Sequence, residues 1–150
     1  MAKFNLTQRR LSDLIVNEVD SPFVGYTRAD GTNAVVTVAG SDVLTLGTPV
    51  FRAKGAVANT KWAPVKAAAN VAATNEYALV IADGLGEQNA MSGAGDHRVT
   101  LLVRGNVVVK KATVEAAAAA VGLTLAADQA NLVHLLRAQG IVAETTIAAA

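Results

Sequence analysis

The chain has 150 residues, no cysteine, and 13 Lys and Arg against 12 Asp and Glu, a formal net charge of +1. This balance argues against a nucleic-acid-binding protein that works by counterion release, because that mechanism needs a basic surface. The lack of cysteine excludes disulfides, thiolate zinc sites and cysteine nucleophiles. Apolar residues form 52% of the chain, with 31 alanines, 21 valines and 4% aromatic residues. The composition therefore predicts one β-leaning globular domain whose core consists of many small side chains.

The first 30 residues differ from the rest, because they carry four Lys or Arg and four Asp or Glu. Apolar residues recur within them at helical spacing: Leu11, Leu14, Ile15 and Val19. This spacing predicts a short amphipathic helix over residues 8–18, with Thr7 as its N-cap. No apolar run has the position of a secretory signal core or the length of a membrane span, so we expect no membrane association. We expect residues 1–30 to form an arm and residues 31–150 to form the domain.

Strand-like segments follow the arm, and each is bounded by turn residues. They cover residues 33–39, 48–54, 61–65 and 76–82. Pro49 suits the start or the edge of a sheet strand, because proline cannot donate to the ladder. Alternation in this strand predicts Val50 on one face and Phe51 on the other. Trp62 is expected to cover a sheet edge.

The segment from Gly84 to Asp96 contains four glycines and predicts a long mobile loop. Two further strand-like runs, residues 98–104 and 107–111, lie on either side of Gly105 and Asn106. They form either a tight hairpin or one long strand bent at a glycine bulge, and we favour the bent strand.

Two helices and a closing strand complete the chain: residues 116–121, 126–139 and 141–147. We expect Thr113 to cap the first helix and Gly122 to end it, since its five consecutive alanines favour helix. Gly140 stands where a helix C′ glycine belongs. The apolar face of the second helix consists of Leu132, Leu135 and Leu136. The elements together predict a mixed α/β, β-rich domain.

No set of residues has the spacing of a known catalytic or metal site. His97 and His134 lack the spacing of zinc ligands. Residues 84–86 lack the third glycine of a dinucleotide loop, and no P-loop lysine follows them. Asp83 and Glu87 are close acids beside a strong strand, and we interpret them as solvated loop residues. We therefore expect no catalytic residues, no cofactor and no metal, and a protein that is not an enzyme.

Five segments carry a family resemblance through their order and spacing. They are Leu46-Gly-Thr-Pro-Val-Phe51, Lys61-Trp-Ala-Pro-Val65, Tyr77-Ala-Leu-Val-Ile-Ala-Asp83, Val99-Thr-Leu-Leu-Val-Arg-Gly-Asn-Val-Val108, and Leu132 to Val142, which ends Leu-Arg-Ala-Gln-Gly-Ile-Val. Over residues 43–147 the chain resembles the head decoration proteins of tailed bacteriophages, the lambda D-like capsid stabilisers. Two regions depart from that family: residues 1–30 are longer and more helix-like than an extended arm, and the alanine-rich residues 67–75 replace an Asp-Gly pair.

The resemblance implies both a fold and a function. The implied fold is a compact β-tulip-like domain with two short helices near the C-terminus and an N-terminal arm. The implied function is that of a homotrimer that binds the major capsid protein on the outer surface of the expanded head, at three-fold or quasi-three-fold sites. Such a protein stabilises the virion against internal DNA pressure and resides in the host cytoplasm before assembly.

Within the arm we expect five apolar residues to contact the capsid: Phe4, Leu6, Leu11, Leu14 and Ile15. The alternative is that these residues only pack within the trimer or within the domain itself. Two other functions also remain open. One is a small-ligand or glycan-binding β-domain, in which the loop of residues 84–96 orders around its ligand. The other is an enzyme on a β-rich scaffold, with a site assembled from distant loops.

Overall fold

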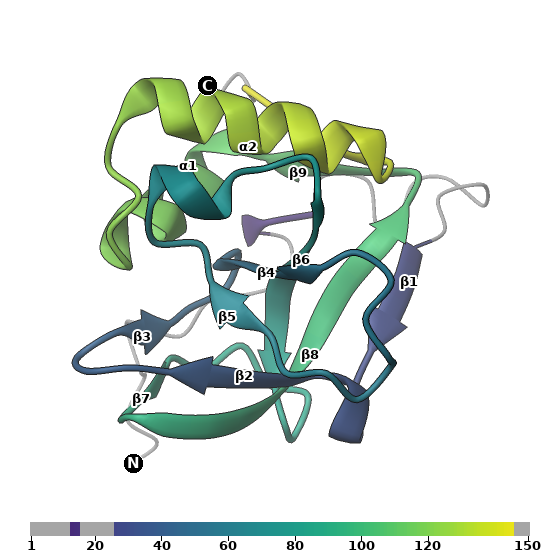
Figure 1. Cartoon of the computed structure of the whole chain (residues 1–150), viewed down its shortest axis with the longest axis vertical. Coiled ribbons are helices and arrows are strands. Elements are labelled where there is room, and N and C mark those ends of the chain that lie inside the picture. The colour runs from purple at the N-terminus through teal and green to yellow at the C-terminus, as the bar shows by residue number, and fades with distance from the viewer. Residues whose placement is uncertain (1–12, 16–25, 146–150) are drawn as a thin grey trace, which may run out of the picture.

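The computed structural model describes residues 13–15 and 26–145. In chain order its strands and helices are β1 (Tyr26–Ala29), the 3-10 turn η2 (Gly31–Asn33), β2 (Val35–Val38), β3 (Val43–Leu44), β4 (Pro49–Ala53), β5 (Ala63–Pro64), the 3-10 turn η3 (Ala68–Asn70), β6 (Asn75–Asp83), β7 (Met91–Ser92), β8 (Gly95–Gly105), β9 (Val107–Lys110), α1 (Lys111–Ala120), α2 (Ala126–Ala138) and β10 (Ile141–Glu144). The predicted mixed α/β, β-rich domain with two short helices near its C-terminus is confirmed (Figure 1). Within the described residues, neither helix has the length and apolar character needed to cross a membrane.

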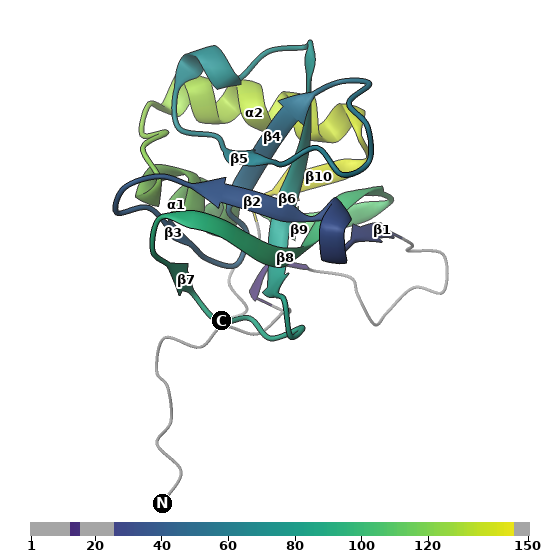
Figure 2. The ribbon, with the colours of Figure 1, turned by 60° about the horizontal axis from the view of Figure 1, so that its bottom comes forward.

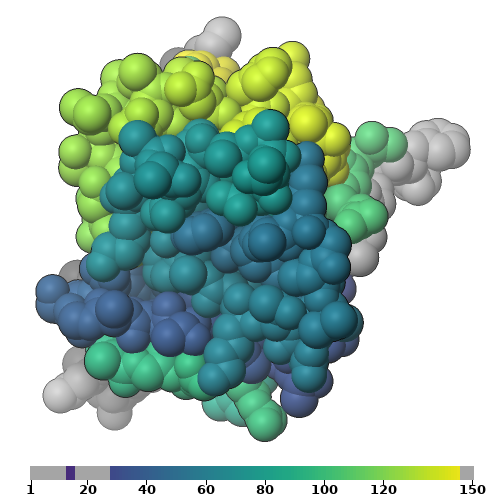
Figure 3. Space-filling view, in the orientation of Figure 1, coloured from purple at the N-terminus to yellow at the C-terminus, as the bar shows by residue number. Residues whose placement is uncertain are grey.

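The central sheet runs in the order β1-β8-β6-β4-β5, and β2 pairs with the other end of β8. Every pairing in this sheet is antiparallel. β8 holds the sheet together because it is 11 residues long and pairs with three strands. In the space-filling view, the dark blue and teal region around β4 and β5 occupies the middle of one face (Figure 3).

The sheet separates two hydrophobic cores, because successive side chains of a strand point to opposite faces. Along β6, Leu79 lies in the core beneath α1 and α2, whereas Val80 lies in the core beneath β2. Val50 and Phe51 divide in the same way, which confirms the predicted alternation of β4. Figure 1 shows the helices gathered at one end of the domain and β2, β3 and β7 at the other, and in Figure 2 β2 crosses in front of β6. We call the core beneath α1 and α2 the helical core. It includes Leu132 and Leu136 from the predicted apolar face of α2.

Trp62, which the sequence places at a sheet edge, has only 1% of its surface exposed. Its backbone bridges to β2, since Trp62 N donates to Val35 O and Thr37 N donates to Trp62 O, each at 2.9 Å. Its indole N–H donates to Asn33 O at 3.2 Å. β2 therefore covers this edge through backbone hydrogen bonds, and the Trp62 ring belongs to the core beneath β2.

β8 and β9 belong to different sheets, and a single residue, Asn106, separates them. β9 pairs in parallel with β10. The hairpin that the sequence left open is therefore wrong, and the favoured bend at Gly105 is closer to the observed path. Gly105 has φ 142°, a conformation that suits glycine.

Three local predictions are wrong because contacts with residues far away in the sequence determine the observed structure. Residues 91–92 and 95–96, predicted as loop, are strand because they pair with β3 and β2. Thr113, predicted as a cap, lies inside α1, and its hydroxyl donates to Asp13 O at 2.7 Å. The helix predicted over residues 8–18 is wrong at Ile15, which forms an antiparallel bridge with Val109.

The C-terminal end of α2 closes a gap between β6 and β8. The side-chain amide of Gln139 accepts a hydrogen bond from Tyr77 N at 2.8 Å. It also donates to Tyr77 O at 2.6 Å and to Val103 O at 2.7 Å. Gly140, the predicted C′ glycine, has φ 83°, and a Cβ at this position would lie 2.0 Å from Gly105 O. Glycine is therefore required here both by conformation and by space.

We predict that Gly140→Ala lowers the free energy of unfolding by about 3 kcal/mol or more, because strained backbone and a backbone clash add. Gly86→Ala is the matched control, since Gly86 has the same φ of 83° but no atom within 4 Å of the place that a Cβ would take. It should cost about 1–2 kcal/mol for the conformation alone. Urea unfolding measures both values, and equal losses would contradict the close approach of Gly140 to Gly105.

Candidate functional site

Two of the five predicted arm residues lie in the helical core. Leu14 and Ile15 are 0% and 2% exposed. Lys110 N donates to Leu14 O at 2.7 Å, so the backbone of this segment is bound to the end of β9. For these two residues the placement corresponds to packing within the domain, the alternative that the sequence left open. Phe4, Leu6 and Leu11 lie outside the described residues.

The loop after β6 is organised by its own acids. Asp83 Oδ1 accepts hydrogen bonds from the amides of Leu85 and Glu87, at 2.9 and 3.0 Å. Asn89 Nδ2 donates to Asp83 Oδ2 at 3.3 Å and to Glu87 Oε2 at 2.8 Å. Partial burial acts to raise the pKa of Asp83, but the hydrogen bonds from Glu87, Leu85 and Asn89 outweigh it and hold that pKa below its ordinary value. The two carboxylates therefore fix the shape of the loop.

A shallow cavity of about 420 Å³ lies beside this loop, bordered by Gly84, Gly86, Asp30 and Arg98. It is the place where the predicted alternative, a small ligand or glycan, would be accommodated.

Neither histidine is among the residues that line this cavity. His97 Nε2 lies 2.7 Å from Gly93 O, and His134 is exposed on α2. Across residues 13–15 and 26–145, no group of three His, Asp or Glu side chains is arranged to hold a metal ion.

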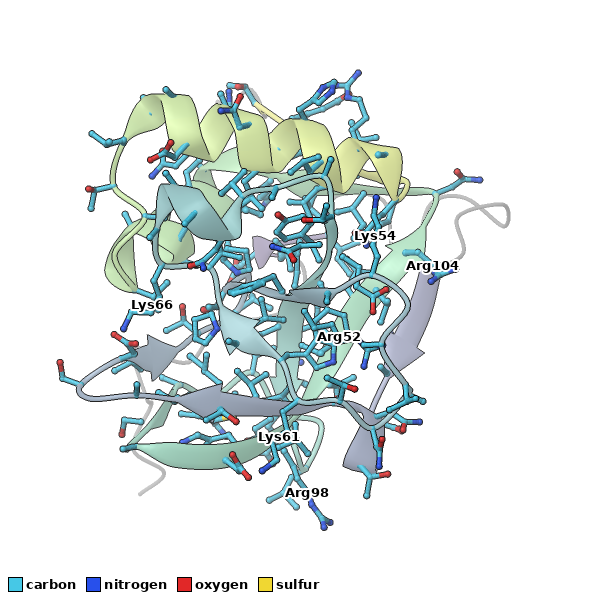
Figure 4. The ribbon with its side chains drawn as sticks, in the orientation of Figure 1. Arg52, Lys54, Lys61, Lys66, Arg98 and Arg104 are labelled. Atoms are coloured by element: carbon cyan, nitrogen blue, oxygen red, sulfur yellow. The ribbon has the colours of Figure 1, made fainter. Side chains whose placement is uncertain are left out.

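A second feature, which the sequence did not reveal, is a pair of positively charged hollows on the face shown in Figure 4. Two adjoining hollows of about 310 Å³ each share Arg104. Four cations and one carboxylate line them: Arg28, Arg52, Lys54, Arg104 and Glu76. Half-buried Ala29 and exposed Ala58 contribute apolar surface, whereas Trp62 and Val103 also line the second hollow but are almost entirely buried. We call the two hollows together the basic groove.

Arg52 builds one wall of the basic groove. Its Nε lies 2.5 Å from Glu76 Oε1, and both side chains are less than one fifth exposed, at 13% and 17%. Its guanidinium lies 4.2 Å from the centre of the Trp62 ring. Its Nη1 donates to Ala58 O at 3.1 Å and to Thr60 O at 3.2 Å, which holds the segment after β4 in place. Because Arg52 neutralises the lining carboxylate, the groove as a whole stays positive.

No family model, curated protein or solved structure matches this chain. The structure defines a mixed α/β, β-rich domain with a basic groove and an organised acidic loop.

We predict that Asp83→Asn loosens the loop after β6 in a pH-dependent way. The folded-state pKa of Asp83 lies below its unfolded value, so ionised Asp83 stabilises the loop above about pH 4. This contribution is lost as the pH falls through the folded-state pKa. Hydrogen exchange at the amides of Leu85 and Glu87 should be faster in the variant at pH 6, and the difference from the wild type should shrink as the pH falls through the folded-state pKa of Asp83. A difference that stays constant with pH would contradict this role.

We predict that Arg52→Ala lowers the free energy of unfolding by about 2–4 kcal/mol, because Glu76 loses its partner in a largely buried place. Lys61→Ala is the matched control. Lys61 Nζ lies 2.6 Å from Asp96 Oδ2, but these side chains are 59% and 44% exposed, so little change is expected. Thermal and urea unfolding of both variants provide the measurement, and similar losses for the two would refute the distinction.

Proposed function

We propose that this protein is a structural protein of a bacteriophage virion. It forms a homotrimer that decorates the outer surface of the expanded head at three-fold or quasi-three-fold sites. There it binds the major capsid protein and stabilises the shell against internal DNA pressure. The five ordered sequence segments support this proposal, and it requires no cofactor and no reactive group.

The structural observation that carries the proposal is the attachment of Asp13, Leu14 and Ile15 to the core. A decorating arm can clamp a neighbouring subunit only if its base is fixed to a rigid body. Here the base is held by the Thr113 hydroxyl on Asp13 O and by the bridge between Ile15 and Val109. Leu14 and Ile15 are therefore anchors of the arm, and the proposed capsid contacts are Phe4, Leu6 and Leu11.

The stabilisation follows from mass action. A protein that binds only the expanded lattice stabilises it by RT ln(1+[L]/Kd) per site, about 2.7 kcal/mol at a hundredfold excess over Kd. A trimer engages several capsid subunits at once, so weak single contacts gain from a high effective concentration. An arm that adds a strand to an exposed sheet edge of the capsid supplies such contacts.

We predict that deletion of residues 2–12 abolishes binding to expanded heads but leaves the unfolding free energy unchanged, because the anchor at residues 13–15 remains. Co-sedimentation with heads that lack this protein measures binding. The control is Leu14→Ala, which removes a fully buried side chain and should cost about 2–5 kcal/mol of stability. Full binding of the shortened chain would overturn the role of the arm.

The second candidate is ligand or glycan binding at the cavity beside Gly84 and Gly86. Saturable binding of a small molecule, abolished by Asp83→Ala or Glu87→Ala and unaffected by deletion of residues 2–12, would favour it over capsid decoration.

A further inference from the structure

The loop after β6 presents an apolar side chain between two carboxylates. Leu85 is 87% exposed, more than any other large hydrophobic residue that the structure describes. Asp83 and Glu87 lie on either side of it, and their hydrogen bonds with Asn89 hold the loop in one shape. A preformed loop loses little conformational entropy when it binds. Figure 2 shows the chain after β6 turning at the end of the domain away from the helices.

The basic groove offers the complementary groups. Exposed Arg104 and Lys54 supply positive charge, and half-buried Ala29 and exposed Ala58 supply apolar surface. Val57, which is 70% exposed, lies in the segment that Arg52 holds beside the groove. An apolar centre with charges around it is the usual anatomy of a protein interface. Figure 4 shows Arg52, Lys54 and Arg104 together on one side of the domain.

We propose that the loop of residues 83–87 in one copy of this chain docks into the basic groove of a second copy. Leu85 covers the apolar part of the groove, and Glu87 pairs with Arg104. The occupant is a second copy because this chain itself carries the matching acidic loop with its exposed leucine. The inference rests on the proposed trimer and identifies the surfaces that build it.

The loop and the groove are different surfaces of one chain, so the contact is heterologous. Repetition of a heterologous contact with a closing rotation produces a ring. Three copies then complete three identical contacts, and no loop or groove of the ring is left vacant. A three-fold ring also matches the symmetry of the proposed capsid sites.

Charge reversal tests this contact in solution, without capsids. Native mass spectrometry and sedimentation of the full chain should show a trimer. Glu87→Arg and Arg104→Glu should each weaken association at least about tenfold, because each places like charges opposite one another. Both side chains are exposed, so thermal unfolding should be unchanged. Arg137→Glu, a reversal at an exposed position of α2 that does not line the groove, is the matched control and should leave the trimer intact.

Recombination of the variants provides the decisive result. The double variant Glu87→Arg/Arg104→Glu should recover the trimer, because the reversed loop meets a reversed groove. An equimolar mixture of the two single variants should associate only partly, because a ring of three made from both always keeps one contact between two copies of the same variant. A wild type that stays monomeric up to about 1 mM, single variants that remain trimeric, or a double variant that stays dissociated would each overturn the proposal. Because no capsid is present, such a result leaves the head-binding measurement to decide the proposed function separately.

Discussion

Gln139 sits where β6 and β8 separate, and its side chain completes the hydrogen bonding that the two strands no longer give each other. One amide group bonds Tyr77 on β6 and Val103 on β8, in place of a backbone rung. The next residue, Gly140, passes so close to Gly105 that no side chain fits between them. At this crossing the chain leaves the central sheet for β9, and α2 turns into β10. Tyr77 belongs to the core beneath the helices and Val103 to the core beneath β2, so this small set of contacts ties the end of α2 to the sheet between the two cores.

The anchor of the N-terminal segment depends on the same crossing. β9 begins directly after it, pairs with β10, and offers Val109 to Ile15. α1 follows β9 and offers the Thr113 hydroxyl to Asp13. Burial of Leu14 and Ile15 then adds apolar area to the helical core, each side chain contributing about 1.5–3 kcal/mol. In the proposed function, a force on the arm is therefore carried to the core beneath the helices.

The surface has a different organisation from the core, because charged groups shape loops that apolar contacts do not fix. Arg52 donates hydrogen bonds to backbone carbonyl groups of the segment after β4. Asp83 accepts hydrogen bonds from backbone amides of the loop after β6. Each loop is thus rigid although it packs little apolar surface. In the proposed function, loops held in one shape in this way supply contacts of fixed geometry.

The amino-acid sequence by itself determined the periodic elements and their turns. Alternation gave β4 its two faces, the leucines of α2 its buried side, and Gly140 the end of that helix, because each signal lies within a few residues of its effect. Only the tertiary structure decided what required a distant partner. β7 needs β3, Ile15 needs Val109, and the basic groove needs β1, β4 and β8 to bring Arg28, Arg52 and Arg104 together. The net charge of +1 does not predict such a groove, because it is a sum over the whole chain. The pairing of strands places cations that are far apart in the sequence on one face of the domain.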